Sequence, residues 1–108
     1  GEDGELEPDT ATRVWREIGL YYKRGEDWPR ALEVWQAWAA QLPWDIEPFI
    51  ECAKYYEWKA RNCAAALVET ERALRRARAY PKGRQRMRWL AALQHRRERL
   101  VGKVGQSQ

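Results

Sequence analysis

Side chains suited to acid–base, nucleophilic or metal chemistry are few and scattered in this chain. Its one histidine, His95, has a single carboxylate at ligand spacing, that of Glu98. Three cationic neighbours, Arg96, Arg97 and Arg99, oppose the binding of a metal ion there. No glycine-rich phosphate loop and no cluster of Cys and His ligands occurs in the sequence. We therefore expect no catalytic residue, metal or cofactor in these residues, and no enzymatic activity of their own.

The two cysteines, Cys52 and Cys63, are a second candidate for chemistry. A disulfide between them is one alternative. Two cysteines on apolar positions of a helical chain are more typical of small buried side chains. We expect both thiols to be reduced, buried and slow to react.

Charge is distributed unevenly along the chain. Residues 1–10 hold five acidic side chains and no basic one, whereas residues 72–103 hold twelve Arg or Lys residues against the single Glu98. Such a basic block attracts nucleic acid phosphates or an acidic partner, or it is a solvated helix face partly neutralised by the acidic segment. The candidate nucleic-acid-binding residues are Arg72, Arg75, Arg76, Arg78, Lys82, Arg84, Arg86 and Arg88.

Composition argues against a membrane span. The 108 residues are 33% charged and have a mean hydropathy of −0.85, and no apolar run is long enough for an anchor or a signal sequence. We therefore expect a cytoplasmic protein. The chain opens on Gly1 instead of Met, and we expect it to be a piece of a longer protein.

Apolar residues at helical spacing, interrupted by Pro, Gly and polar caps, predict an all-α fold. The expected helices cover about 10–23, 28–42, 46–59, 63–80 and 84–101. Asp9 or Thr10 is expected to cap the first helix and Asp45 the third. The predicted organisation is an acidic flexible tail over 1–9, one helical domain over 10–101 and a flexible tail over 102–108.

Seven tryptophans suggest either a packed core or an aromatic binding site. Trp15, Trp28 and Trp35 recur at the spacing of a helix interior, so we assign them to the core. Trp38, Trp44 and Trp58 are less well explained by packing. These three are the candidates for ligand contact.

Seven residues, in order and spacing, resemble one complete tetratricopeptide (TPR) unit. They are Trp15, Ile18, Gly19, Tyr22, Ala31, Trp35 and Pro43. The start of the pattern recurs 34 residues later as Phe49, Cys52, Ala53 and Tyr56, and it then slips by one residue. The second unit is therefore expected to have a turn one residue longer than the first.

The resemblance implies a TPR-like stack of two antiparallel helical hairpins, with 84–101 as a capping helix. Gly19 and Ala53 would lie at close helix crossings. The family's outward-facing groove positions correspond to Arg13, Arg16, Leu20, Lys23 and Arg24 in the first unit, and to Glu47, Ile50, Lys54, Glu57 and Trp58 in the second. These positions imply a protein or peptide partner that is acidic. Leu20 and Lys54 stand where carboxylate-clamp members carry asparagine, which argues against recognition of a peptide's terminal carboxylate by that clamp.

A narrower resemblance covers about residues 12–100. The run Pro48-Phe49-Ile50-Glu51-Cys52-Ala53-Lys54-Tyr55-Tyr56-Glu57, with Ala66-Leu67 and Glu71-Arg72-Ala73-Leu74, is similar to the TPR-like tail of bacterial ribonuclease H-like, predicted exonuclease proteins. That resemblance implies an accessory module of a nuclease. Three functions are thus expected as alternatives: a protein-interaction module, a nucleic-acid-binding accessory domain, and a purely structural cap.

Overall fold

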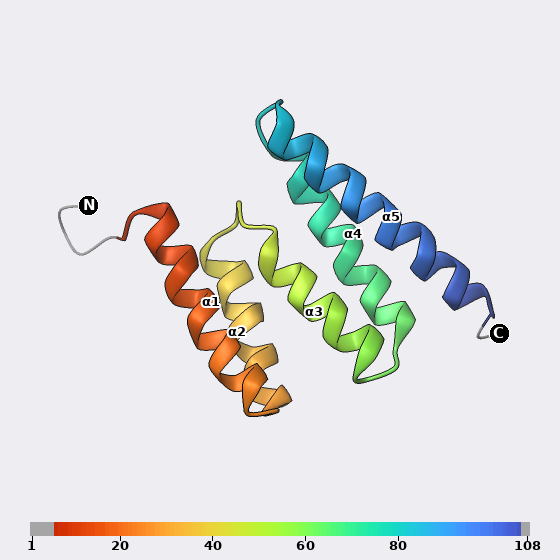
Figure 1. The fold of residues 1–108 in the computed structure, drawn as a ribbon, viewed down its shortest axis with the longest axis horizontal. Helices are drawn as coiled ribbons and strands as arrows, with labels where there is room; N and C mark the ends of the chain where they lie inside the picture. The colour runs from red at the N-terminus through yellow and green to blue at the C-terminus, as the bar shows by residue number, and fades with distance from the viewer. Residues whose placement is uncertain (1–5, 107–108) are drawn as a thin grey trace. The chain divides into compact units, whose positions relative to one another are not determined.

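The computed structural model describes residues 6–106, and every regular element within them is an α-helix (Figure 1). The helices are α1 (Pro8–Arg24), α2 (Trp28–Gln41), α3 (Glu47–Trp58), α4 (Cys63–Ala79) and α5 (Arg84–Gln106). The prediction of an all-α fold is confirmed. Most of the predicted acidic tail, residues 1–5, lies outside the described residues.

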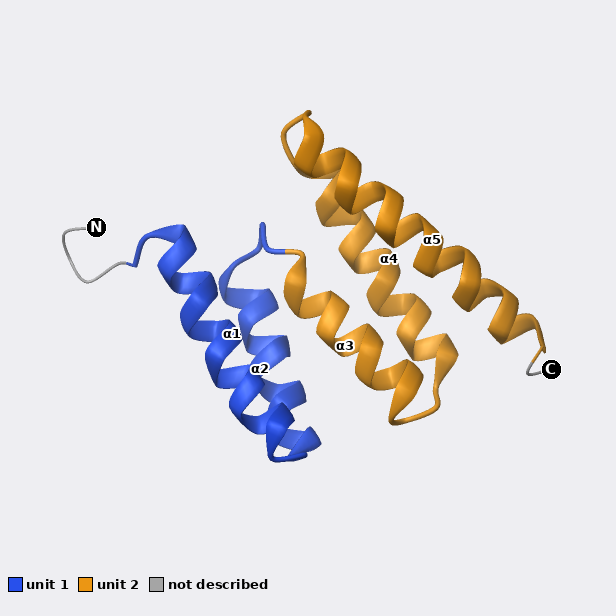
Figure 2. Cartoon of the chain, in the orientation of Figure 1, with its two compact units in different colours: residues 1–45 blue, residues 46–108 orange. Residues whose placement is uncertain are grey.

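The chain divides into two compact units, residues 1–45 and residues 46–108 (Figure 2). Unit 1 contains the hairpin of α1 packed on α2. In unit 2, α3 packs on α4, and α4 packs in turn on α5. Two helical hairpins followed by one further helix are the order of elements that the sequence predicts.

The hairpin of unit 1 depends on a close approach between α1 and α2. Gly19 is buried, and a Cβ atom added to it would lie 2.6 Å from the indole Nε1 of Trp35. Trp35 is itself buried, together with Ala31 on the same helix. Only glycine therefore fits at the crossing. Ala53, the equivalent position on α3, is completely buried, so both small residues lie on interior faces as predicted.

Asp45 does not cap α3 as predicted. The N-cap residue is Ile46, which has no side-chain cap. Asp45 is buried instead, and its Oδ2 accepts hydrogen bonds from Trp38 Nε1 at 2.9 Å and from Thr12 Oγ1 at 2.8 Å. The bonds tie α1 and α2 to the end of unit 1. They also correct the assignment of Trp38 as a ligand contact, because its indole is 1% exposed and its N–H is already satisfied.

The two hairpin turns are built alike and differ by one residue. Three residues separate α1 from α2, and four separate α3 from α4, which confirms the longer second turn. Each turn ends in a side-chain cap: Asp27 accepts from the backbone N–H of Arg30, and Asn62 from that of Ala65. The left-handed residue of the first turn is Glu26, with φ of 56°, and not the neighbouring glycine.

Two predicted helix ends are wrong. The N-cap of α1 is Glu7, without a side-chain hydrogen bond, so neither Asp9 nor Thr10 caps it. Helix α5 continues through residues 102–106, which the sequence places in a flexible tail. Packing explains the extension, because Leu100 is buried and Lys103 and Val104 beyond it are half-buried.

The core of unit 2 lies where α4 meets its two neighbours. It consists of Ile46, Ala73, Leu74, Ala77 and Leu93, with Phe49, Ile50, Tyr80, Trp89 and Leu90 packed against it. Alanines on α4 allow both neighbouring helices to approach closely. Leu93 and Leu100 of α5 are buried, which fixes the rotation of α5 about its own axis.

Candidate functional site

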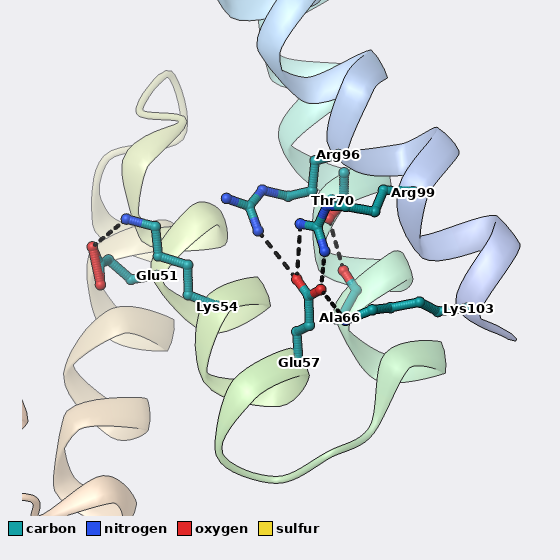
Figure 3. A network of polar contacts seen from close by, with 8 residues as sticks. All are labelled: Glu51, Lys54, Glu57, Ala66, Thr70, Arg96, Arg99 and Lys103. Carbon is teal, nitrogen blue, oxygen red and sulfur yellow. Dashed lines mark hydrogen bonds and ion pairs between the residues drawn. The ribbon is translucent and has the colours of Figure 1, made fainter. Parts of the chain in front are cut away.

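Three cations of α5 converge on one buried carboxylate of α3 (Figure 3). The side chain of Glu57 is 1% exposed. Arg99 donates to both of its oxygens, with Nη2 3.0 Å from Oε1. Lys103 Nζ lies 2.8 Å from Oε2, and Arg96 Nη1 lies 3.4 Å from Oε1. We call Arg96, Arg99 and Lys103 the α5 cation cluster.

Helical geometry brings the α5 cation cluster together. The three residues are spaced by three and four positions, which places them on one face of the helix. Glu57 is in the last turn of α3, and the side chains of the α5 cation cluster reach over to it (Figure 3). The prediction that Glu57 lies on an outward groove face is therefore wrong. Residues 102–106, which the sequence places in a flexible tail, continue α5, and Lys103 among them covers Glu57 together with Arg96 and Arg99.

The electrostatics favour an ionised Glu57. Burial alone would raise the pKa of this carboxyl, but the hydrogen bonds from Arg99 and Lys103 outweigh burial and lower it. Glu57 in return raises the pKa of Arg99, chiefly through the hydrogen bond. Burial lowers the pKa of Arg96, and the charge of Arg99 adds to that effect.

The α5 cation cluster sets three positive charges around the one negative charge of Glu57. Its side chains remain 21–36% exposed to solvent, so they can meet a ligand while they hold the carboxylate. The indole of Trp58 is 51% exposed and lies beside them, with Lys103 Nζ 4.2 Å and the Arg99 guanidinium 5.6 Å from ring centres of the residue. An aromatic face next to partly exposed cations can bind a carboxylate or phosphate together with an apolar group.

Of the groove positions predicted in unit 2, Glu57 and Trp58 belong to this site, Glu57 as its buried carboxylate and Trp58 as its exposed indole. Ile50 packs against the core and is half-buried. Lys54 is exposed, with its Nζ 3.7 Å from Glu51 Oε1 on the same helix. Glu47 is half-buried at the start of α3.

The predicted groove positions in unit 1 all lie on α1. Arg13, Arg16 and Arg24 are exposed, whereas Leu20 and Lys23 are half-buried. The exposed cations are therefore spread along the length of α1 and are not gathered at one point.

The eight predicted nucleic-acid-binding residues do not share one face. Arg72 pairs with Glu69 of its own helix at 2.7 Å, and its charge acts on Cys52 and Tyr56 of α3. The Arg76 guanidinium lies 4.4 Å from the ring centre of Phe49, so both arginines lie on the α3 side of α4. Arg75 and Arg78 line a groove against α5. The remaining four lie in the loop after α4 and in the first turns of α5. Lys82, Arg84 and Arg88 are exposed, and Arg86 is half-buried.

The groove between α4 and α5 is the second cationic feature of unit 2. It has a volume of about 540 Å³ and is lined by Glu71, Leu74, Arg75, Arg78, Gln94, Arg97 and Glu98. Arg97 lies 3.5 Å from Glu71. Arg75 and Arg78 form no ion pair with any residue of the described range.

The two cysteines differ in environment. Cys52 is buried, and burial, followed by the charges of Glu69 and Glu51, raises the pKa of its thiol to about 12. Cys63 is only half-buried at the start of α4, which corrects the prediction that both are buried. Both are free thiols.

Sequence reasoning missed the α5 cation cluster, although part of its signal was visible. Arg96, Arg99 and Lys103 share one helix face in the sequence, but their partner is 39 to 46 positions away. Within residues 6–106, no group of three or more Cys, His, Asp or Glu side chains is placed to hold a metal, and no helix has the length and apolarity to cross a bilayer.

Comparison with known proteins gives no relative. The chain matches no protein-family model, no curated protein and no solved structure.

Proposed function

We propose that this chain is a non-catalytic, TPR-like protein-interaction module whose partner presents acidic side chains. The proposal rests on one observation above others: three partly exposed cations share a single carboxylate beside the exposed indole of Trp58. Helical hairpins with small residues at their crossings, such as Gly19, are also the architecture of interaction repeats.

The proposed recognition has two parts. A carboxylate of the partner approaches the exposed edges of Arg99 and Lys103, whose orientation Glu57 already fixes. An apolar group next to that carboxylate covers Trp58. Because the cations are held in place before binding, little side-chain entropy is lost on association.

A titration tests the proposal. We expect a fluorescently labelled peptide rich in Glu and Leu to bind the chain, and a Lys/Leu peptide of equal length not to bind. Lys103→Ala and Trp58→Ala should each weaken binding by about tenfold. Arg84→Ala is the matched control, because Arg84 is an exposed cation of the same helix outside the cluster. An equal loss of peptide affinity in Arg84→Ala, or equal affinity for the Glu/Leu and Lys/Leu peptides, would show that the attraction is non-specific.

A second function, nucleic-acid binding as an accessory domain of a ribonuclease H-like exonuclease, is favoured by a different observation. Arg75 and Arg78 have no ion-pair partner among the described residues and share a groove with Arg97. Two unneutralised guanidinium groups one turn apart suit phosphates of a nucleic acid backbone. Glu71 and Glu98 in the same groove reduce its positive charge, which places this function second.

The third alternative is a purely structural cap. Helix α5 is fixed to α3 by the ion pairs of Glu57, and a helix that only closes a core needs no more than that. A cap predicts no charge-selective peptide binding in the titration above.

A further inference from the structure

An apolar stripe on α1 has no partner among residues 6–45, the part of unit 1 that the structure describes. Val14, Ile18 and Tyr21, spaced by four and three residues, are 42%, 41% and 72% exposed. Residues of α1 that face α2, among them Ala11 and Gly19, are buried. With about 100° between successive residues, the stripe points to one side of the α2 contact. Isolated exposed apolar residues are common, but three in register on one helix form a continuous surface.

Two cations flank this stripe on the same side. Arg13 precedes it and Arg24 follows it, and neither makes an ion pair with a described residue. Eleven positions separate them, which is about three helical turns or roughly 16 Å. Glu17 is the one acidic residue of α1 between the two arginines.

The stripe leads into a groove at the C-terminal end of α1. The groove has a volume of about 740 Å³ and is lined by Glu17, Tyr21, Tyr22, Arg24, Gly25, Asp27 and Arg30. Asp27 and Arg30 neutralise each other at 2.8 Å. The rings of Tyr21 and Tyr22 meet edge to face, 5.2 Å between centres, which holds the exposed Tyr21 in place. Of the two arginines that line this groove, Arg24 is therefore the one whose charge can meet a ligand.

A second copy of this chain is a poor occupant of the stripe. An antiparallel α1 pair centred on Ile18 would place Arg13 of one copy opposite Lys23 and Arg24 of the other. A parallel pair would bring equivalent arginines together. Either arrangement desolvates like charges side by side, which costs binding energy.

We infer that the stripe of Val14, Ile18 and Tyr21 docks an amphipathic helix of another protein, with acidic residues about three turns apart that meet Arg13 and Arg24. The apolar face of that helix covers the stripe, and one apolar side chain enters the groove beside Tyr21. The surface belongs to unit 1, and the inference is independent of the function proposed for the α5 cation cluster.

The test uses the whole chain and two synthetic amphipathic peptides. Both carry the same leucine stripe; one has Glu and the other Lys at two flanking positions eleven residues apart. We expect the Glu peptide to bind about tenfold more tightly than the Lys peptide. The double variant Arg13→Glu/Arg24→Glu should reverse this preference, and because both side chains are exposed the fold should be kept.

A second variant tests the apolar contact. Ile18→Ser should weaken binding of the Glu peptide by about tenfold, whereas Val68→Ser, on an exposed valine of α4, should not. Three outcomes overturn the inference: no binding of the Glu peptide, a preference unchanged in the charge-reversed variant, or a dimer in sedimentation that Ile18→Ser dissociates. If the chain binds no acidic peptide at the α5 cation cluster and Trp58 but still binds the Glu peptide at the α1 stripe, the proposed function is wrong and this inference stands.

Discussion

The indole of Trp35 lies directly over Gly19, at a distance that leaves no room for a Cβ atom. Because Trp35 is buried, it cannot move aside into solvent. The crossing of α1 and α2 therefore depends on the absence of one methyl group.

Gly19→Ala should destabilise unit 1 by about 1–3 kcal/mol, because overpacking at this site displaces Trp35 or separates the helices. Urea unfolding followed by tryptophan fluorescence measures the change. Gly102→Ala is the control: nothing lies within 4 Å of a Cβ at this α5 position, so the higher helix propensity of alanine should stabilise the chain by about 0.5–1 kcal/mol. An equal response at the two sites would contradict the close crossing.

Glu57→Gln should lower the free energy of unfolding by about 2–4 kcal/mol at neutral pH, since it leaves three cations beside a neutral amide. Chemical denaturation measures the loss. Lys54→Gln, which removes an exposed charge with its Nζ 3.7 Å from Glu51, is the matched control and should change little. An unchanged free energy of unfolding in Glu57→Gln would mean that water solvates the three cations as well as the carboxylate does.

The pH dependence of stability follows from the lowered pKa of Glu57. A carboxyl whose folded pKa lies below its ordinary value of 4.5 stabilises the fold fully above that value, and the stabilisation is lost as pH falls through the folded pKa. The difference in stability between wild type and Glu57→Gln should thus be constant near neutrality and shrink in acid. Denaturation at a series of pH values checks this, and a difference independent of pH would contradict an ionised Glu57.

The two thiols should label at different rates in the folded chain. Cys52 is buried and its pKa is raised to about 12, so it should react only on unfolding. Cys63 is half-buried and should react faster. Labelling of Cys52→Ser and Cys63→Ser variants with a maleimide, followed by mass spectrometry, assigns each rate. Rapid labelling of Cys52 would show that α3 opens readily from α4.

Oligonucleotide binding, which the second function predicts, should depend on Arg75 and Arg78. Affinity falls with salt with a slope of about −0.7 to −0.9 per phosphate contact. Arg75→Glu/Arg78→Glu should therefore make the slope less steep by about 1.5, whereas Arg84→Glu/Arg88→Glu should have a smaller effect, because those side chains lie outside the groove lining. Fluorescence anisotropy at two salt concentrations measures both. No binding at low salt would leave protein docking as the function.

Local signals were enough to predict the helices and turns. The turn before Cys63 is one residue longer than the turn before Trp28, as the slip in the repeat predicts. The resemblance to a TPR unit implies a crossing at Gly19, and the structure has one there. These features depend on neighbours within a few residues, so a pattern in one sequence suffices to find them.

Charged and polar partners were not predictable in the same way. Asp45 looked like a helix cap, yet it accepts hydrogen bonds from Trp38 and Thr12. An acidic residue before a helix fits both roles by sequence. The choice depends on which side chains the hairpin brings within hydrogen-bonding distance.

The sequence by itself determined that the chain is helical and where its turns lie, because these follow from apolar periodicity and from Pro and Gly breaks. The resemblance to a repeat unit also located the small residues that face the interior. Only the tertiary structure decided that Glu57 is buried and that Arg96, Arg99 and Lys103 meet on it. It also divided the basic residues among separate faces and left the α1 stripe exposed. The physical reason is that charge pairing and exposure depend on how a neighbouring helix is rotated and how long it is. Residues far along the chain determine both.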